Sequence, residues 1–351
     1  MPTELTVLTA DYCQRQSWSG IGVAAAIQAR ALAAQGCLVD VLSPSIETPP
    51  RPTVNPRLHV LPRERFPLSP QRGGLLHLHS LGQAQLAREL VHRFRLRLVY
   101  TAHALPHREL PDSARAHHWS AVQDRIFAHA DRVVFLNESD QADACHHIPG
   151  LGTRSCVLPN PISRAQPVAS GHRENLVLFV GRLAASKGIA LFAATVAGLL
   201  DRGCSWNFAV AGGHGDAAEY EMVTGLAARY HRRCRLPGWL DRPAMHALYA
   251  RASLVLIPSR YEPCGMVALE AMRMGVPVLA SGAGGLARLA DPESGAQIVD
   301  DDSPQSWIEA CEGLIASDTL RRELSLRGPA YVAAQCDPQR WARRFLAAVE
   351  H

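Results

Sequence analysis

The sequence predicts an α/β protein with two doubly wound parallel-sheet domains, and three observations lead to this prediction. The chain has 351 residues, enough for two domains of ordinary size. Short apolar runs alternate with helical patterns along most of it, as in a parallel sheet with crossover helices. Residues 162–174 are polar and rich in turn formers, which indicates a linker between the two domains.

The composition is that of a folded protein with a sizeable core. Apolar residues make up 47% of the chain and charged residues 19%, which excludes an intrinsically disordered class. No apolar run reaches a membrane-spanning length, and the first residues lack the basic start and long apolar stretch of a secretory signal. The nine cysteines are scattered without a Cys-x2-Cys pair, which favours reduced thiols over disulfides or metal ligands. We therefore expect a cytoplasmic protein.

The charge balance is mildly basic, with a formal net charge of +4 and a pI near 8.6. This balance does not indicate nucleic acid as a partner, and the sequence indicates no particular oligomeric state. Of the 36 basic residues, only Lys187 is a lysine. Drift in a GC-rich genome explains the arginines, but it does not explain the exception unless a compact ammonium group is needed there.

The first domain is expected at residues 1–162. Its strands are predicted at 5–10, 38–42, 58–61, 75–78, 98–100 and 131–136. Helices are predicted at 23–35, with Gly36 as the stop, and at 81–94. Gly20 and Gly22 would then lie in the turn between the first strand and the first helix, where a doubly wound fold binds phosphate.

Three histidines stand at or beyond strand ends in this domain. His77 and His79 alternate along one strand, so both are expected on one face of the sheet, and the alternative is that one of them is a core histidine bonded to backbone. His103 follows the strand 98–100 at the end where open α/β sheets bind their ligands. A histidine there can donate one hydrogen bond while its other nitrogen is held in place.

The second domain is expected at residues 163–337, with strands at 176–180, 208–211, 254–257, 278–280 and 297–299 and a helix at 304–316. Arg182 and Lys187 lie in the turn between its first strand and first helix. One forked and one compact cation at the start of a helix can neutralise a diphosphate. A last helix at 338–351 would present Trp341, Phe345, Leu346 and Val349 on one face.

Residues 252–285 read as strand, loop, helix and strand, and they carry the chemistry of the second domain. Glu262 precedes a proline, which holds it in an extended conformation outside the helix. The first helical N–H groups, those of Gly265, Met266 and Val267, would be free at the positive end of the helix dipole, where phosphate or hydroxyl groups bind. Glu270 falls at least a turn into the helix, where it can accept hydrogen bonds from hydroxyl groups. Two carboxylates beside a helix start suit a ligand that is part anion and part polyol, such as a nucleotide sugar.

This stretch resembles the signature of the retaining GT-B glycosyltransferases, family 4 in particular. The family has a Glu-x7-Glu motif after a strand that ends in Pro-Ser; here the glutamates are Glu262 and Glu270. Glu-Ala-Met, Gly-Val-Pro-Val and Gly-Gly follow, so we disfavour the alternative that both glutamates are merely solvated. Residues 261–265 are also similar to the glycogen synthases. The resemblance covers nearly the whole chain and is strongest from 176 to 285.

The resemblance implies the GT-B fold, in which two Rossmann-like domains face each other across a cleft. Arg182 and Lys187 match the family's diphosphate clamp, and Gly212 its second glycine turn. Thr101-Ala102-His103 matches its Thr-x-His motif, and residues 235–239 the segment around the base. The family usually has a Gly-Gly pair where this chain has Ser19-Gly20, which leaves open how closely that loop approaches the donor phosphates. The last helix is expected to cross back to the first domain.

The implied activity is transfer of a hexose or N-acetylhexosamine, with retention, from a nucleoside diphosphate sugar to a hydroxyl acceptor, a small metabolite or a glycan. A UDP sugar is favoured, held by the second domain, while the first domain binds the acceptor. Arg182 and Lys187 would carry the diphosphate charge, Glu270 the ribose, and Glu262 the sugar. His103 would contact the sugar from the other domain. No Asp-x-Asp motif appears, so no metal ion is expected to be required.

Two other functions remain open, and so does the acceptor. A nucleotide-sugar epimerase would use a similar clamp without an acceptor, and a non-catalytic nucleotide-sugar-binding protein would turn over nothing. Residues 107–118, with His107, Arg108, His117 and His118, lie in a segment that could face the acceptor. The cluster Arg88, Arg93, Arg95 and Arg97 is either a solvated face or a membrane contact. We favour the solvated face because no strong apolar stripe accompanies it.

Overall fold

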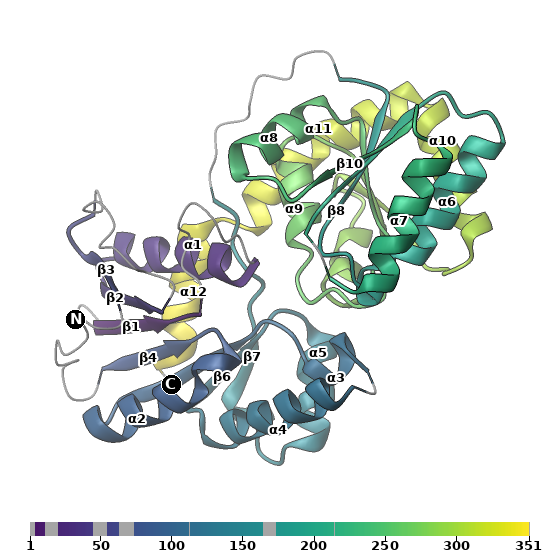
Figure 1. Ribbon diagram of the computed structural model, residues 1–351. Helices are drawn as coiled ribbons and strands as arrows, with labels where there is room; N and C mark the ends of the chain where they lie inside the picture. The colour runs from purple at the N-terminus through teal and green to yellow at the C-terminus, as the bar shows by residue number, and fades with distance from the viewer. Residues whose placement is uncertain are drawn as a thin grey trace. The chain divides into compact units, whose positions relative to one another are not determined.

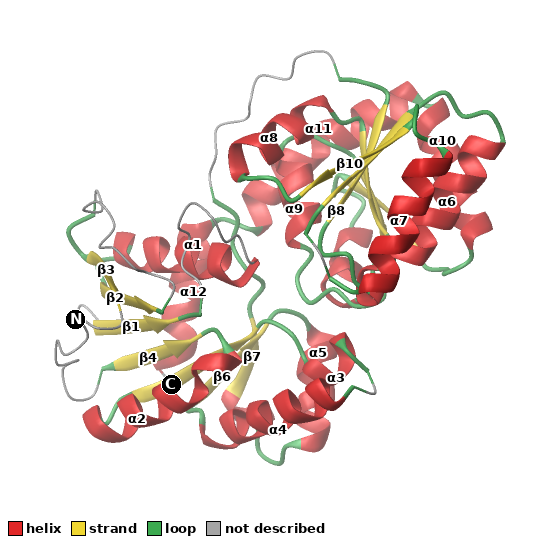
Figure 2. Cartoon of the chain, in the orientation of Figure 1, coloured by secondary structure: helices red, strands yellow, loops and turns green. Residues whose placement is uncertain are grey.

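The computed structural model describes residues 4–10, 20–44, 55–62, 74–111, 113–163, 173–213 and 215–350. The chain divides into two compact units: residues 1–163 with 336–351, and residues 164–335. Each unit is built on one parallel sheet flanked by helices (Figures 1 and 2). The prediction of two parallel-sheet α/β domains is therefore confirmed.

The sheet of the first unit has seven strands in the order β3-β2-β1-β4-β5-β6-β7, and all neighbours run parallel. The strands are β1 (Glu4–Leu8), β2 (Leu38–Ser43), β3 (Leu58–Pro62), β4 (Leu75–Leu78), β5 (Arg97–Ala102), β6 (Arg132–Phe135) and β7 (Ser155–Val157). The strand order reverses between β1 and β4, which is where doubly wound sheets form their ligand crevice. His79 follows β4 and His103 follows β5, so the topology brings both to the carboxyl edge of the sheet, where such sheets bind ligands.

The helices of the first unit cover both faces of that sheet. They are α1 (Gly20–Ala34), α2 (Ala84–Phe94), α3 (Pro106–Glu109), α4 (Ala114–His129), α5 (Glu138–His147) and α12 (Pro338–Glu350), with short 3-10 turns η2 (Leu81–Gln83) and η3 (Gly152–Arg154). Helix α12 packs on α1, and it buries Trp341, Phe345 and Val349 in the same core as β1 and β2. The C-terminal helix thus belongs to the first unit, although it follows the second in sequence; residue 351 lies outside the described residues.

The start of α1 corrects one prediction. The helix begins at Gly20, three residues earlier than expected, so Gly20 and Gly22 form its first turn and not a loop before it. The helix penalty of glycine, about 1 kcal/mol relative to alanine, applies to helix interiors, and these two glycines lie in the first turn. The preceding turn, with Ser19, lies outside the described residues.

The sheet of the second unit has six parallel strands in the order β10-β9-β8-β11-β12-β13. The strands are β8 (Leu176–Val180), β9 (Asn207–Ala211), β10 (Cys234–Gly238), β11 (Leu254–Ile257), β12 (Val278–Ser281) and β13 (Ala296–Val299). The helices are α6 (Ile189–Asp201), α7 (Ala217–Arg229), α8 (Arg242–Arg251), α9 (Met266–Arg273), α10 (Pro304–Ala316) and α11 (Asp318–Gln335), with 3-10 turns η4 (Ala185–Lys187) and η5 (Gly284–Ala290). Here β8 and β11 are adjacent, so the loops that follow them lie together.

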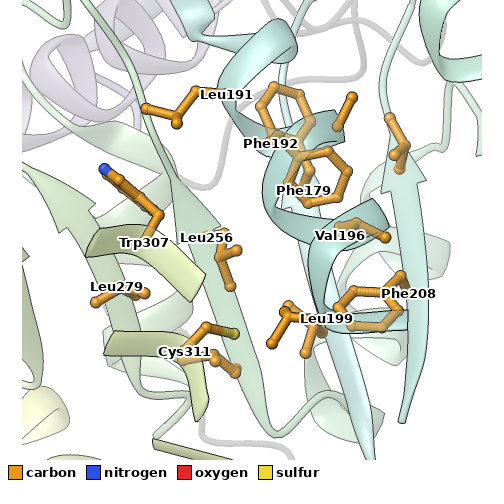
Figure 3. Close-up of a cluster of buried hydrophobic side chains, with 14 of the residues drawn as sticks. Phe179, Leu191, Phe192, Val196, Leu199, Phe208, Leu256, Leu279, Trp307 and Cys311 are labelled. Atoms are coloured by element: carbon orange, nitrogen blue, oxygen red, sulfur yellow. The ribbon is translucent and has the colours of Figure 1, made fainter. Parts of the chain in front are cut away.

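Aromatic side chains fill the core of the second unit (Figure 3). Phe179 of β8 and Phe192 of α6 pack with ring centroids 5.2 Å apart, and Phe208 of β9 lies below them. Trp307 of α10 is fully buried, and its indole N–H donates to the carbonyl of Asp301 at 2.8 Å. This packing holds α6 and α10 against the sheet, and it fixes the strand ends that carry the candidate site.

The structure bears on the expectations for the cysteines and for membrane-spanning segments. Cys13 lies outside the described residues, and the other eight cysteines are free thiols. Within the described ranges, no helix combines the length and the apolar character that a bilayer crossing requires.

Candidate functional site

The turn after β8 lies against the loop after β11, and a glycine makes this approach feasible. Gly188 has φ +71°, and a Cβ atom on it would lie 1.7 Å from the carbonyl oxygen of Pro258. The carbonyl of Ser186 accepts hydrogen bonds from the N–H groups of Arg260 and Tyr261, at 2.9 and 3.1 Å. The turn that carries Lys187 and the loop that carries Glu262 are therefore joined through their backbones.

Lys187 and Glu262 form an ion pair at this junction. The Lys187 Nζ atom lies 2.8 Å from Oε2 of Glu262 and 3.4 Å from the Tyr261 carbonyl oxygen. Only 17% of the lysine side chain and 15% of the glutamate side chain are exposed. Burial acts to raise the pKa of Glu262, but the charge of Lys187 and hydrogen bonds from Lys187, Gly265 and Cys264 outweigh it, and the pKa is lowered. The Glu262 carboxylate is therefore charged at neutral pH.

Helix α9 begins directly beside this pair. Gly265 is its N-cap, with φ +77°, and its N–H group donates to Oε1 of Glu262 at 3.0 Å. The expectation of a free Gly265 N–H group is thus wrong, because Glu262 already occupies it. The N–H groups of Met266 and Val267 have no acceptor in the part of the chain that the structure describes. These two groups remain for an anion or a hydroxyl oxygen.

Residues that follow β12 contact the Glu262 loop and hold it in place. The N–H group of Gly285 donates to the Glu262 carbonyl at 2.8 Å, and a Cβ atom on Gly285 would lie 2.4 Å from the Pro263 carbonyl oxygen. The Arg288 guanidinium donates to the Cys264 carbonyl at 2.8 Å. Neither role was predicted from the sequence, although the Gly-Ala-Gly-Gly run that ends at Gly285 was an available signal.

Glu270 lies on α9 in a different environment. Its side chain is half-buried, and burial raises its pKa against the opposing positive charges of Arg273 and Arg242. Within the described ranges its carboxylate makes no hydrogen bond or ion pair. The hydroxyl group of Tyr249 nearby is buried without a hydrogen-bond partner among the described residues. Buried polar groups in folded proteins usually have hydrogen-bond partners, so the lack of one at Glu270 and at Tyr249, in the part of the chain that is described, is unusual.

The turns after β8 and β9 pack against each other closely. A Cβ atom on Gly212 would lie 1.7 Å from the Gly181 carbonyl oxygen, and one on Gly215 would lie 2.2 Å from that of Leu183. Arg182 is exposed in the first of these turns. Trp239, which follows β10 and lies beside Gly213, keeps 47% of its surface exposed. His214 lies outside the described residues.

The histidines of the first unit form a separate polar cluster. Nε2 of His77 lies 2.8 Å from Oγ1 of Thr101, and Nδ1 of His79 lies 2.9 Å from Nε2 of His103. Burial, helped by the neighbouring His103, lowers the pKa of His77 to about 3. Burial alone lowers the pKa of His103 to about 4. His77 is thus a core histidine bonded to a side chain, and all of these rings are neutral at physiological pH.

The segment expected near the acceptor is largely engaged in structural contacts. Nε2 of His107 lies 2.8 Å from Asp143, and Arg108 pairs with the buried Asp140 at 2.7 Å. Both contacts tie α3 to α5, whereas His117 and His118 are exposed on α4. The four arginines of the basic cluster are also exposed; they are Arg88, Arg93, Arg95 and Arg97.

The predicted site residues therefore fall into two sets. Lys187, Glu262 and the start of α9 lie together, Glu270 lies farther along the same helix, and Arg182 shares its turn with Lys187. Gly212 supports that turn. Gly20, Gly22 and His103 belong to the first unit. The described residues contain no cluster of three or more His, Cys, Asp or Glu side chains suited to a metal ion.

Comparison with known families and sequences gives the following similarities. Residues 174–317 match the family described as "Glycosyl transferases group 1". D-inositol 3-phosphate glycosyltransferase from Corynebacterium glutamicum is 28% identical over 70% of this chain and 65% of its own length. Glycogen synthase from Deinococcus radiodurans is 36% identical over 38% of this chain and 28% of its own length. The chain spans just under two thirds of the length of the inositol phosphate glycosyltransferase.

Solved structures are similar over the whole chain. Sucrose-phosphate synthase from Thermosynechococcus elongatus has a TM-score of 0.79 at 21% identity, over 99% of this chain and 98% of its own. HepE from Anabaena, solved in complex with UDP-glucose, has a TM-score of 0.73 at 16% identity, over 99% of both chains. At these identities the likeness shows the fold, which is GT-B. The predicted fold is therefore confirmed.

Proposed function

We propose that this chain, which has the GT-B fold and carries a glycosyl transferases group 1 segment at residues 174–317, is a retaining glycosyltransferase. The donor is a nucleoside diphosphate sugar, and the acceptor is a hydroxyl group of a small metabolite or a glycan. The observation that carries this proposal is the ion pair of Lys187 and Glu262 beside the free N–H groups that begin α9. It brings a cation, an anion and helix N–H donors together where the turn after β8 meets the loop before α9.

Each site residue has a task in this proposal. Lys187 and Arg182 take up the charge that develops on the diphosphate as its bond to the sugar breaks. Glu262 and the N–H groups of Met266 and Val267 hold sugar hydroxyl groups. Glu270 accepts hydrogen bonds from the ribose. Gly212 supports the diphosphate turn, His103 contacts the donor sugar, and Gly20 and Gly22 begin a helix whose N–H groups face anionic ligands.

The reaction needs no protein nucleophile. The acceptor oxygen attacks the anomeric carbon on the face that the leaving diphosphate departs from, and the bond from that carbon to the phosphate oxygen breaks. The acceptor proton passes to the released phosphate oxygen, so charge and atoms balance. Two cations near that oxygen stabilise it. No metal ion is assigned a part, since Lys187 and Arg182 supply the positive charge.

Relatives guide the choice of substrates. HepE was solved with UDP-glucose, and the Corynebacterium relative acts on D-inositol 3-phosphate according to its name. A UDP sugar is therefore the first donor to test, and cyclitols are the first acceptors. The proposal leaves the hexose open between glucose, N-acetylglucosamine and mannose.

The first experiment identifies the donor. The melting temperature is measured with each nucleoside diphosphate sugar, because a ligand that binds only the folded chain raises it with affinity. Turnover of the best donor is then compared between the wild type and Lys187→Ala. Loss of one preorganised contact to the transition state should lower turnover by roughly 100-fold or more. Arg202→Ala is the control, because Arg202 pairs with Glu312 at the far end of α6 and should leave turnover unchanged.

The outcomes separate the alternatives. Formation of a new sugar isomer from donor alone would indicate an epimerase. Donor binding without turnover in any acceptor mixture would indicate a nucleotide-sugar-binding protein. Unchanged turnover in Lys187→Ala would contradict the assignment of the diphosphate clamp.

A further inference from the structure

Residues 77–79 and residues 101–103 of the first unit lie side by side at the ends of the adjacent strands β4 and β5. β4 and β5 run parallel, with His77 opposite Val99 and Leu78 opposite Tyr100. Because side chains alternate along a strand, His77 and His79 share one face, as do Thr101 and His103. His77 forms a hydrogen bond with Thr101, and His79 forms one with His103.

The bond between the two histidines has a direction. Burial lowers the pKa of both rings, so each is neutral and carries one N–H group and one bare nitrogen. A single proton therefore lies between Nδ1 of His79 and Nε2 of His103, which are 2.9 Å apart. Either His79 donates it, or His103 does.

The other nitrogen of His79 decides between these possibilities. Nε2 of His79 is buried and has no hydrogen-bond partner among the described residues. If His103 were the donor, His79 would carry its proton on this Nε2 atom, as an orphaned buried N–H group. Such donors are rarer in folded proteins than buried acceptors that lack a partner. The proton of His79 is therefore placed on Nδ1.

We propose that His79 is a positioning residue, which donates its Nδ1–H group to Nε2 of His103 and thereby makes His103 a hydrogen-bond donor through its own Nδ1 atom. His103 is half-buried, and its Nδ1 atom has no hydrogen-bond partner in the part of the chain that the structure describes. This N–H group donates to a ligand oxygen that has a lone pair, such as a sugar hydroxyl or ring oxygen. The contact between His103 and a sugar oxygen rests on the proposed function, whereas the tautomer of His103 does not.

His77 lies behind this pair and provides a matched comparison. Its ring centroid lies 4.1 Å from that of His79 and 4.6 Å from that of Phe345 on α12. Its hydrogen bond goes to Thr101 and not to His103. His77 and His79 are therefore equally buried histidines of the same strand region, and only one of them bonds to His103.

The tautomer is measured directly by NMR on the full chain labelled with 15N-histidine. The His103 signals are the ones lost in His103→Gln. We expect a protonated Nδ1 and a bare Nε2 in the wild type. In His79→Asp, the new carboxylate can only accept, so the His103 proton should move to Nε2. A protonated Nε2 of His103 in the wild type would overturn the proposal, and this measurement needs no substrate.

The functional consequence is measured with UDP-glucose, or with the donor that the melting-temperature screen selects. His79→Asn keeps an amide N–H group near the position of Nδ1, whereas His79→Leu removes the donor without adding charge. We expect kcat within about threefold of wild type for His79→Asn, and a loss of roughly tenfold or more for His79→Leu, with KM for the donor little changed. His77→Gln, which keeps a donor towards Thr101, should behave as wild type.

Equal kcat values for His79→Asn and His79→Leu, in variants that melt as the wild type does, would contradict the role of the donated hydrogen bond. If His79→Leu does not fold, the comparison of His79→Asn with His79→Asp decides instead, since both are polar and only the first donates. If no donor is bound or turned over by the wild type, the proposed function fails, and the tautomer measurement still decides whether His79 positions His103.

Discussion

Nζ of Lys187 lies 2.8 Å from Oε2 of Glu262, so the only lysine of the chain is paired with the first glutamate of the Glu-x7-Glu motif. From the sequence, we expected Lys187 to contact the diphosphate and Glu262 to contact the sugar. In the structure each holds the other in place, in a site where little of either side chain is exposed. A substitution of one therefore changes the other, and the variants are best designed in pairs.

Lys187→Ala should destabilise the second unit. It leaves the Glu262 carboxylate largely buried without its cation, which should cost about 1–3 kcal/mol of unfolding free energy. The double variant Lys187→Ala with Glu262→Gln removes that buried charge and should recover part of the loss. Urea unfolding measures both, with Arg202→Ala as control, because its exposed pair should be worth less than about 1 kcal/mol. Equal stability of Lys187→Ala and Arg202→Ala would rule out this account of the pair.

Glu270 should make donor binding depend on pH. Burial raises its pKa, so the carboxylate becomes protonated at a higher pH than an ordinary glutamate and then accepts hydrogen bonds less strongly. Affinity for UDP-glucose, measured by calorimetry, should therefore fall on acidification from a pH above the usual glutamate range. Glu270→Gln should bind roughly tenfold more weakly at neutral pH and show a flatter profile. An identical pH profile in the variant would remove Glu270 from the ribose.

Gly188 and Gly203 provide a matched test of the turn after β8. Both have positive φ, +71° and +85°, but only Gly188 lies against backbone, with the Pro258 carbonyl oxygen 1.7 Å from the position that a Cβ atom would take. Gly203→Ala should cost about 1–2 kcal/mol for its backbone conformation alone. Gly188→Ala should cost clearly more, because the turn must move away from the Glu262 loop, and it should weaken donor binding as well. Similar melting temperatures and donor affinities for the two variants would contradict the close approach of these loops.

His77 should contribute to acid unfolding of the first unit. Its pKa falls from 6.5 to about 3 on folding, so the unfolded chain binds the proton first. Its effect on stability is therefore absent above about pH 6.5 and destabilising below it, by about 1.4 kcal/mol per pH unit until the pH nears the folded value. His77→Gln cannot be protonated, so its stability should fall less steeply between pH 6 and 4. Parallel stability curves for variant and wild type would show that His77 is protonated in the folded chain.

Much of the fold follows from local sequence. The apolar runs that form β8 and β11 and the pattern that forms α10 were predicted to the residue, because each is bounded by glycine, proline or a capping serine. Helix α11 was missed, and it contains Pro329, which ordinarily marks the end of a helix. Helix α4 was missed because only scattered positions of it are buried, which weakens the helical period.

The site was predictable in its members and not in its contacts. Arg182, Lys187 and Glu262 stand at turns that glycines and prolines reveal in the sequence, and Glu270 lies in the helix that follows Gly265. The pairing of Lys187 with Glu262 joins residues 75 positions apart and depends on β8 and β11 being neighbours. The bond from His79 to His103 likewise depends on the register of β4 and β5. Contacts of this kind follow from sheet order, which local patterns do not specify.

The most direct test of the diphosphate clamp uses the single lysine. A chain grown with lysine labelled with 13C at the ε carbon carries one labelled side chain, that of Lys187, so its NMR signal needs no assignment. Adding UDP should shift this signal, because the ammonium group then contacts phosphate oxygens, whereas uridine should leave it in place. An unmoved signal at a UDP concentration that raises the melting temperature would contradict the central claim.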